Sequence, residues 1–431
     1  MSRYPSGELG RICEVKIGRQ RSPRHQNGPN MVPYVRAANV KDGVLGIDDL
    51  LEMNFTPAEQ DAYQLRIGDV LVTEGCGSPA ELGASAQWRG APAAVVCYQN
   101  HLLRLRAIPD VSDASYLTHL ARWCQHTRRW LAVSSGTGIL NIGQARAQTL
   151  VVPAPPMEVQ QKIGAILSAY DDLIENNNRR IKLLEEMAQR IYREWFVDFR
   201  YPGHEDVPLV DSEMGPIPQG WRVADTGQLI AAGVIEIGDG YRAKSSEFGS
   251  PGLPFVRIRD LNDDFDFAGV DLLPFAALPA VGPKVSQPGD CVISTKGTVG
   301  RVICISDLTP RFVYSPQLSY WRVLDSTIAG AFLREWLGGP EFEEQCARVK
   351  GGTDMADYVN LKNQRHMLIS LPAASIQQQF ARLADPMFDE TERLRLTRCT
   401  ARTTRALLLP RLISGEIDVE NLDVAVPDAA A

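Results

Sequence analysis

The chain has 431 residues, of which 44% are hydrophobic, 23% charged and 7% aromatic. This composition is ordinary for a globular protein and excludes a collagen-like, fibrous or largely disordered chain. The length predicts two or three domains. No apolar run reaches the roughly 18–20 residues of a membrane span, and the first residues lack a hydrophobic signal region, so we expect a cytoplasmic protein.

Acidic charge is concentrated at the C-terminal end of the chain. The formal net charge is −7, and residues 415–431 contain five acidic and no basic residues. Residues 1–156 contain 16 basic and 13 acidic residues, and the stretch from Lys16 to Arg36 has five basic residues and no acidic one. An acidic chain of this kind does not exclude a local phosphate-binding face.

Short segments recur in the same order in the two halves of the chain. Four pairs match at offsets of 216 to 221: residues 33–36 and 254–257, 68–73 and 289–294, 136–137 and 352–353, and 159–161 and 376–378. The offset drifts only by the few residues that small loop insertions would cause. The sequence therefore predicts two copies of a unit of roughly 210–220 residues.

The first portion of each copy is rich in glycine, proline and short β-branched runs. Short strands are predicted at Val70–Thr73, Ala93–Cys97, Val292–Ser294 and Arg301–Ile305. Some helix is expected around 116–130 and 329–348. The fold class predicted for this portion is α+β, with strands dominating.

The second portion of the first copy predicts a long helix. Apolar residues alternate at spacings of four and three, a heptad seam typical of a coiled coil. The seam residues are Ile163, Leu167, Tyr170, Ile174, Asn177, Ile181, Leu184, Ala188, Ile191 and Trp195. A helix over residues 157–195 would be roughly 57 Å long at about 1.5 Å per residue.

The second copy predicts a similar helix with a poorer seam. Its seam residues are Ile376, Phe380, Leu383, Met387 and Leu394, while Glu390, Thr397 and Thr404 stand at further expected apolar positions. Pro386 is expected to kink this helix or restart it.

We expect the two helices to pair with each other; the alternative is that each packs separately on its own domain. Asn177 either fixes the register within the seam or faces solvent.

Signatures of catalysis and of metal binding are missing. The sequence has no phosphate-binding GxxxxGK[ST] loop, no GxGxxG loop that opens a helix, no HExxH and no Asn-Pro-Pro-aromatic motif. The eight cysteines form no CxxC pair, so we interpret them as buried thiols rather than zinc ligands or a disulfide framework. We predict no catalytic residue, no metal site and no cofactor held by this chain.

Taken together, these features resemble the specificity subunit of type I restriction–modification enzymes, often called HsdS. The segments that carry the resemblance are 155–163 (PPMEVQQKI), 171–177 (DDLIENN), 289–301 (GDCVISTKGTVGR) and 407–417 (LLLPRLISGEI). The first copy departs from the pattern, because residues 73–77 (TEGCG) replace the Lys-Gly-Thr form of 296–298.

The resemblance implies two β-rich target recognition domains related by the repeat and separated by two long antiparallel coiled-coil helices. The implied boundaries are 1–154 for the first recognition domain, 155–205 for the central spacer helix, 206–371 for the second recognition domain, 372–414 for the distal spacer helix and 415–431 for an acidic tail.

The resemblance also implies a non-catalytic subunit that chooses a bipartite, asymmetric DNA sequence. Two modification subunits would bring S-adenosylmethionine-dependent adenine methylation. Restriction subunits would bring cleavage driven by ATP, with Mg²⁺.

Arginine and lysine on loops are natural contacts to phosphate and guanine, and threonine in the matched Gly-Thr loops could approach DNA. The candidate DNA-binding residues are Arg19, Arg21, Arg24, Arg36, Thr137, Arg242, Lys244, Arg257, Lys296, Arg301, Lys350 and Thr353. For each of them, the alternative is an ordinary solvated or turn residue.

Two alternative functions can be weighed against DNA recognition from the sequence. A protein–protein scaffold, with two β-rich modules on a helical hairpin, would share the architecture and need no basic face. A tandem RNA-binding protein lacks support, because no aromatic motif of the RNP type is present.

Overall fold

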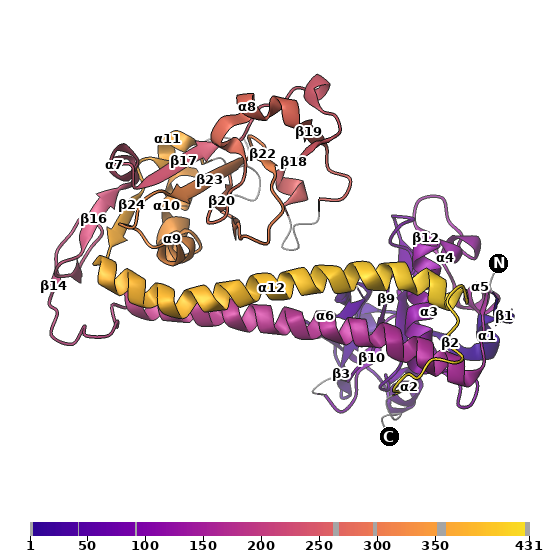
Figure 1. Cartoon of the computed structure of the whole chain (residues 1–431). Coiled ribbons are helices and arrows are strands. Elements are labelled where there is room, and N and C mark those ends of the chain that lie inside the picture. Colours follow the sequence, from indigo (N-terminus) through magenta and orange to yellow (C-terminus); the bar gives the residue numbers. More distant parts are fainter. Residues whose placement is uncertain are drawn as a thin grey trace. The chain divides into compact units, whose positions relative to one another are not determined.

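The computed structural model describes residues 3–41, 43–90, 93–261, 267–295, 300–350 and 359–426. The chain divides into two compact units, the first formed by residues 1–173 and 401–431 and the second by residues 174–400. Each unit contains a β-rich part and portions of two long helices, α6 (Met157–Tyr192) and α12 (Ala374–Ile413) (Figure 1). The predicted α+β fold with two β-rich domains and two long helices is confirmed.

The first unit is built on a four-stranded antiparallel sheet in the order β2-β11-β7-β9. Its strands are β2 (Cys13–Ile17), β7 (Val70–Thr73), β9 (Ser85–Gln87) and β11 (Leu102–Ala107). A smaller sheet joins β10 (Cys97–Tyr98), β3 (Met31–Val35) and β6 (Leu51–Asn54), with β10 parallel to β3. Of the run predicted as a strand at Ala93–Cys97, only Cys97 lies in a strand.

Three short two-stranded pairs complete the strands of this unit. They join β1 (Ser6–Glu8) to β13 (Val151–Pro153), β4 (Val40–Lys41) to β5 (Val44–Leu45), and β8 (Gly75–Cys76) to β12 (Leu140–Asn141).

The shorter helices of the first unit are α1 (Leu9–Ile12), α2 (Pro57–Tyr63), α3 (Ala114–His126), α4 (Arg129–Ala132) and α5 (Gln144–Gln148). Of these, α1, α3 and α5 contact the larger sheet, α2 contacts β10 of the smaller sheet, and α4 contacts α3. The side chain of Asp113 caps α3 by accepting a 2.8 Å hydrogen bond from the backbone N–H of Tyr116. Leu117 and Leu120 of α3 then join Val72 in one buried cluster, which fixes the helix to the sheet.

The second unit repeats this topology. Its four-stranded sheet, β17-β23-β20-β21, contains β17 (Ile235–Asp239), β20 (Cys291–Ser294), β21 (Val302–Cys304) and β23 (Leu318–Val323). Its smaller sheet joins β19 (Leu272–Pro274), β18 (Gly252–Val256) and β22 (Val313–Tyr314). The parallel pairing of Tyr34 with Cys97 recurs as Phe255 with Val313, as the internal repeat predicts.

Two further strand pairs and five α-helices complete the second unit. The pairs are β14 (Leu209–Val210) with β15 (Ile217–Pro218), and β16 (Arg222–Asp225) with β24 (Leu368–Leu371). The helices are α7 (Thr226–Ala231), α8 (Leu278–Val281), α9 (Gly330–Leu337), α10 (Pro340–Lys350) and α11 (Leu361–Gln364). Large aromatic side chains from α9, α10 and the sheet fill the core, including Trp321, Trp336 and Phe342.

The two long helices run antiparallel within each unit. In the second unit, Arg180 and Glu185 of α6 form ion pairs of 2.6 Å with Glu390 and Arg395 of α12. In the first unit, Asp171 of α6 is paired with Arg405 of α12. The prediction that the helices pair with each other is confirmed, and α12 continues through Pro386 without the predicted restart.

The seam residues of α6 lie as the heptad pattern places them. Ile163, Leu167, Ile174, Asn177 and Ile181 are buried, and Tyr170, Leu184 and Ile191 are half-buried. Asn177 therefore does not face solvent, and its Nδ2 has no hydrogen-bond partner among the described residues.

The buried row of α12 differs from the predicted one. Phe380 and Leu394 are buried and Ile376 and Met387 are half-buried, but Leu383 is 46% exposed. The buried row passes instead through Ala384, Thr391 and Arg398, each of which stands one position after an expected seam residue. The poor apolar pattern arises because these seam positions carry small or polar side chains.

The segment after α12 returns to the first unit. The backbone N–H of Arg3 donates to the carbonyl oxygen of Ser414 at 2.8 Å, and its guanidinium pairs with Asp418 at 2.9 Å. Val419 is fully buried in the core of the unit. The beginning of the acidic tail is thus part of the folded unit.

Two further properties concern membranes and cysteines. Among the described residues, no helix combines the length and the apolar character needed to cross a bilayer. No disulfide joins the eight cysteines, all of which the structure describes; five are buried as predicted, and Cys76, Cys304 and Cys399 are half-buried. The Sγ atoms of Cys291 and Cys304, which face each other across β20 and β21, lie 2.8 Å apart.

Candidate nucleic-acid interface

A loop between β2 and β3, residues 18–30, carries three of the five basic residues between Lys16 and Arg36. Its first residue is a glycine because a Cβ at Gly18 would lie 2.2 Å from the carbonyl oxygen of Gln99. This close approach lets the backbone N–H of Arg19 donate to the Tyr98 carbonyl at 3.1 Å. Residues 18–30 are hereafter called the first loop. The beginning of the first loop is therefore fixed to the sheet.

Arg19 anchors the first loop inside the unit. Its guanidinium forms a 2.8 Å ion pair with Glu59, lies 4.8 Å from the centroid of the Phe55 ring and donates to the carbonyl oxygen of Asn54. The Asn54 side chain also accepts a 2.8 Å hydrogen bond from the backbone N–H of Asn30, at the other end of the loop. With only 8% of its side chain exposed, Arg19 does not present its charge at the surface.

The middle of the first loop projects three polar side chains outward. Arg21, Arg24 and Gln26 are exposed. Arg24 lies in a 3-10 turn, η1 (Pro23–His25), which the hydroxyl of Ser22 caps. Among the described residues, neither Arg21 nor Arg24 makes an ion pair, so both guanidinium groups can take an external ligand.

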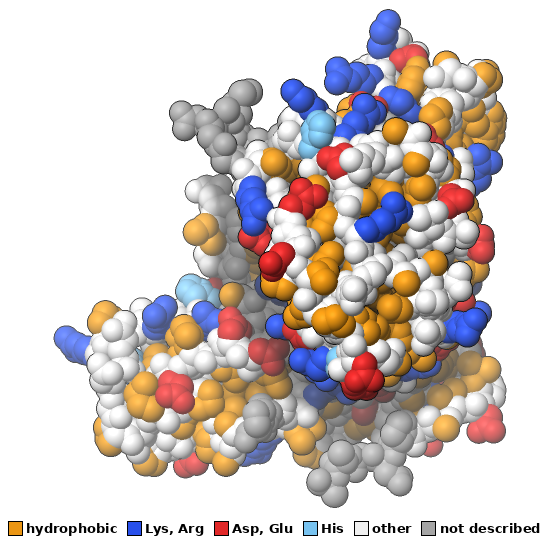
Figure 2. Space-filling view, turned by 90° about the vertical axis from the view of Figure 1, so that its left-hand side faces the viewer, with side chains coloured by type: hydrophobic (Ala, Val, Ile, Leu, Met, Phe, Trp, Pro, Cys, Tyr) orange, Lys and Arg blue, Asp and Glu red, His pale blue; other side chains and the backbone are white. Residues whose placement is uncertain are grey.

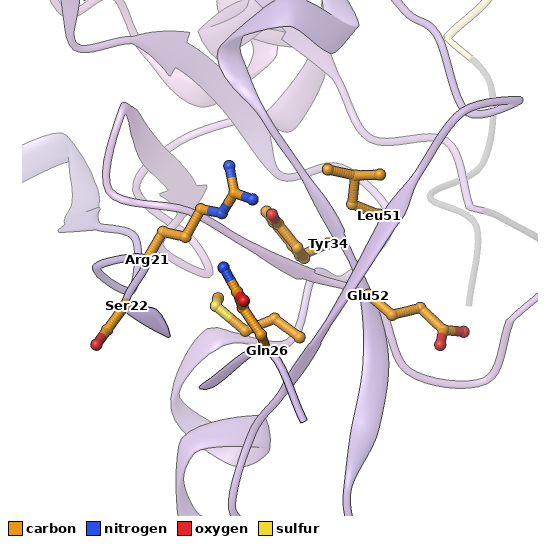
Figure 3. A pocket seen from close by; sticks show the side chains of 7 residues that line it. Arg21, Ser22, Gln26, Tyr34, Leu51 and Glu52 are labelled. Atoms are coloured by element: carbon orange, nitrogen blue, oxygen red, sulfur yellow. The ribbon is translucent and has the colours of Figure 1, made fainter. Parts of the chain in front are cut away.

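A hollow of about 230 Å³ lies beside this loop. Its lining is formed by Arg21, Ser22, Gln26, Tyr34, Leu51, Glu52 and Met53. The side chains of Arg21, Gln26 and Leu51 point into one space above Tyr34, whereas Glu52 and Ser22 point away from it (Figure 3). Tyr34 and Met53 are buried, so they form a solid floor contributed by β3 and β6.

The corresponding loop of the second unit, residues 240–251, lies between β17 and β18. Lys284 holds its beginning by donating to Asp239 at 2.8 Å and to the carbonyl oxygen of Gly240 at 3.0 Å. Arg242 and Lys244 are exposed in this loop, hereafter the second loop. The backbone N–H of Tyr241 donates to the Tyr314 carbonyl as that of Arg19 donates to the Tyr98 carbonyl, so Arg242 matches Gln20 and stands one position before the counterpart of Arg21. Each loop nevertheless carries an exposed arginine near its beginning.

The second loop differs from the first in its 3-10 turn, where η4 (Ser245–Glu247) corresponds to η1 and Glu247 corresponds to His25. Glu247 accepts hydrogen bonds from the backbone N–H of Lys244 and, at 2.9 Å, from the hydroxyl of Tyr241. These two bonds hold the pKa of Glu247 below its ordinary value. The second loop thus carries a carboxylate, which the first loop lacks.

Arg36 and Arg257 occupy matching positions in the repeat, and each forms an ion pair with an aspartate of its own unit. Arg36 pairs with Asp49 at 2.8 Å and Arg257 with Asp271 at 2.7 Å. About a quarter of each arginine side chain is exposed. Because each positive charge is already balanced by an aspartate, these arginines are less available to phosphate than Arg21 or Arg242.

The remaining candidates lie on other loops. Thr137 is exposed at the tip of a turn that two backbone hydrogen bonds of 2.9 and 2.8 Å between Ser135 and Asn141 close. Arg301 is exposed next to β21, and its backbone N–H donates to the hydroxyl of Ser294 at 3.0 Å. Lys296 and Thr353 lie outside the described residues, as does the side chain of Lys350 at the end of α10.

The repeated Gly-Asp segments have a structural role that the sequence analysis missed. Asp69 is buried and pairs with Arg106 at 2.7 Å; Asp290 is buried and pairs with Arg322 at 2.6 Å. Burial opposes the charge of Arg322, but its hydrogen bond and ion pair with Asp290 outweigh this and raise the pKa of the guanidinium. The recurrence of Gly-Asp in both copies was a signal for the aspartates, but the distance along the chain to the arginine differs, 37 residues in the first copy and 32 in the second.

The described residues contain no group of His, Cys, Asp and Glu that could hold a metal ion. On the face shown in Figure 2, the described basic side chains stand among acidic and apolar ones.

The features that recur in both units are therefore the two outward arginines on anchored loops. A fold of two homologous β-rich domains, each with such a loop, together with two long antiparallel helices, defines a tandem recognition protein rather than a single-site enzyme.

Comparisons with known proteins agree with this class. Residues 1–186 match the family described as the type I restriction modification DNA specificity domain. The type I restriction enzyme MjaIX specificity subunit of Methanocaldococcus jannaschii is 25% identical over 316 residues, 72% of this chain and 70% of the relative. The MjaVIII specificity subunit of the same organism is 26% identical over 297 residues, 67% of each chain.

A bacterial relative and a solved structure extend the similarity. The type I restriction enzyme HindI specificity subunit of Haemophilus influenzae is 23% identical and covers 62% of this chain and 69% of its own. The crystal structure of the type I restriction–modification S subunit from M. genitalium shares the fold with a TM-score of 0.59, 13% identity and 96% coverage of both chains. Residues 1–186 thus match the type I restriction modification DNA specificity domain, and most of the chain is similar to type I restriction enzyme specificity subunits.

Proposed function

We propose that this chain is the sequence-specificity subunit of a type I restriction–modification enzyme and binds a bipartite, asymmetric target in double-stranded DNA. The observation that carries the proposal is the repeat. Two units of one topology each present an exposed arginine, Arg21 in the first and Arg242 in the second, near the beginning of an equivalent loop. Each unit would then read one half of the target, with its arginines meeting phosphate and base edges.

Differences between the two loops support an asymmetric target. In the loops and in the strands that follow them, His25 and Tyr34 of the first unit correspond to Glu247 and Phe255 of the second. A neutral imidazole both donates and accepts hydrogen bonds, whereas a carboxylate only accepts them. Two surfaces with different donors and acceptors are expected to prefer different base pairs, so the half-sites should differ.

The chain itself would be non-catalytic. We propose that two modification subunits dock on it and supply S-adenosylmethionine-dependent adenine methylation, and that restriction subunits add ATP- and Mg²⁺-dependent translocation and cleavage. Exposed apolar side chains on the long helices, such as Leu183 and Met187 of α6, support a role for these helices in docking protein partners.

A salt titration separates this function from that of a protein–protein scaffold. The full chain, assembled with the modification subunits of its system, is titrated with duplex DNA at several salt concentrations. A DNA-reading subunit should lose affinity linearly with the logarithm of salt concentration, because each phosphate contact releases counterions. A scaffold should show no such slope, and that result would overturn the proposal.

A further inference from the structure

We propose that the hollow beside the first loop reads one base pair of the target and that Arg21 selects guanine there. This inference rests on the proposed function and adds the residue that determines one position of the first half-site. The guanidinium of Arg21 can donate two parallel hydrogen bonds, which match the O6 and N7 acceptors of guanine in the major groove.

Arg21 and Arg24 both lack an acidic partner among the described residues, and of these two only Arg21 lines the hollow. Inside the first unit, Arg104 pairs with Glu14, Arg106 with Asp69, and Arg122 with Asp171 at 2.9 Å. Arg21 has no ion pair among the described residues, and its guanidinium reaches into the hollow (Figure 3). The donors of Arg21 are therefore available to a ligand without first breaking an internal bond.

The hollow is preformed by rigid elements. Its floor consists of Tyr34 and Met53, which are 1% and 2% exposed and belong to paired strands of one sheet. The loop above it is fixed at both ends, because Asn54 accepts hydrogen bonds from Arg19 and Asn30. A base contacted here would find Arg21 already held near its place, which lowers the ordering cost of binding.

The composition of the hollow favours a base edge over a phosphate. The lining residues carry one basic side chain, Arg21, and one acidic side chain, Glu52, which points away from the hollow, so their formal charges cancel and the lining as a whole does not favour an anion. Leu51 and Tyr34 add apolar surface against which a neutral base can pack. Arg24 lies in the same loop but outside the hollow, where a phosphate contact is the natural use of its charge.

The test is a selection from a library of random duplexes, carried out with the full chain and the modification subunits of its system. We expect the unaltered protein to require guanine at one position that Arg21→Ala relaxes, with preference over the other bases falling by about 5- to 150-fold. The second half-site should be unchanged. Arg24→Ala, the matched control, should weaken binding to all sequences alike and leave the preferred sequence intact.

A second substitution, Arg21→Gln, keeps the test informative if Arg21→Ala simply abolishes binding. Arg21→Gln should move the preference at that same position from guanine towards adenine, because a glutamine amide matches the N6 and N7 edge of adenine. If Arg21→Ala and Arg21→Gln both retain the original sequence, Arg21 reads no base and this inference is wrong. If the unaltered protein selects no sequence at all, the proposed function itself fails.

Discussion

Gln160 of α6 and Gln377 of α12 occupy matching positions in the repeat and make the same three hydrogen bonds. Gln160 donates through Nε2 to the carbonyl oxygens of Val111 and Pro155 at 3.1 and 2.9 Å. Its Oε1 accepts from the backbone N–H of Asp113 at 3.0 Å. Asp113 is the residue that caps α3, so Gln160 fixes the long helix to the start of α3 in its own unit.

Gln377 repeats this arrangement in the second unit. Its Nε2 donates to the carbonyl oxygens of Thr327 and Pro372 at 3.3 and 3.0 Å, and its Oε1 accepts from the backbone N–H of Ala329 at 3.0 Å. Ala329 immediately precedes α9. The Gln-Gln pair shared by both copies is thus explained by its first glutamine, which joins a long helix to the β-rich part of its unit.

Replacement of Gln377 should destabilise the second unit. We expect Gln377→Ala to lower the free energy of unfolding by about 2–3 kcal/mol, because it leaves buried carbonyl and N–H groups without partners. Urea denaturation measures this loss. The neighbouring Gln378 is exposed, and Gln378→Ala should change stability by less than about 0.5 kcal/mol. Equal effects of the two substitutions would refute this role of Gln377.

The stability of the second unit should fall as the pH rises from about 4.5 to about 7. Burial raises the pKa of Glu335 in α9 to about 7; Glu185 acts in the same direction, and Arg334 opposes it. A carboxyl group whose pKa is raised on folding stabilises the protein below its unfolded pKa, near 4.5, and this contribution is lost as pH rises through about 7.

Glu335→Gln removes this titration. At pH 8 we expect the free energy of unfolding of the variant to exceed that of the unaltered protein by up to about 3 kcal/mol. Urea denaturation measures this difference. At pH 5 the two proteins should be nearly equal. Glu343→Gln removes a charge from the exposed surface of α10 and serves as control. A gain for Glu335→Gln that is the same at both pH values would contradict the assigned cause.

Asn177 should reduce the stability of the paired helices. It is 2% exposed and its Nδ2 has no hydrogen-bond partner among the described residues. We expect Asn177→Leu to raise the free energy of unfolding by about 1 kcal/mol, since it replaces a buried, incompletely bonded amide with an apolar side chain. Asn176→Leu, one residue earlier on the exposed side of α6, should give no such gain. Destabilisation by Asn177→Leu alone would show that the amide is needed in the seam.

The sequence predicted the repeat and the long helices well because both depend on regular spacing. It predicted the buried row of α12 poorly, since that row contains polar side chains whose partners lie on α6. Arg395 and Arg398, for example, bind Glu185 and the side-chain oxygen of Asn178 at 2.6 and 2.9 Å. Such pairs join residues more than 200 positions apart, and no local pattern reveals them.

The same limit applies to the candidate site. Arg19 and Arg21 stand two residues apart in one loop, and nothing in their neighbourhood along the chain distinguishes them. Glu59 and the ring of Phe55 make Arg19 an internal anchor, whereas Arg21 is left to line a hollow. Which arginine faces outward is decided by contacts distant in sequence, and these are formed only by the folded sheet.

The DNA motif methylated by the assembled enzyme tests the central claim most directly. Residues 222–350 are exchanged for the corresponding residues of a relative with a different target, and the methylated motif is determined by sequencing genomic DNA from cells that carry either protein. If each unit reads its own half-site, one half of the motif should change while the other stays the same. A change in both halves, or in neither, would contradict the claim that the two units read DNA independently.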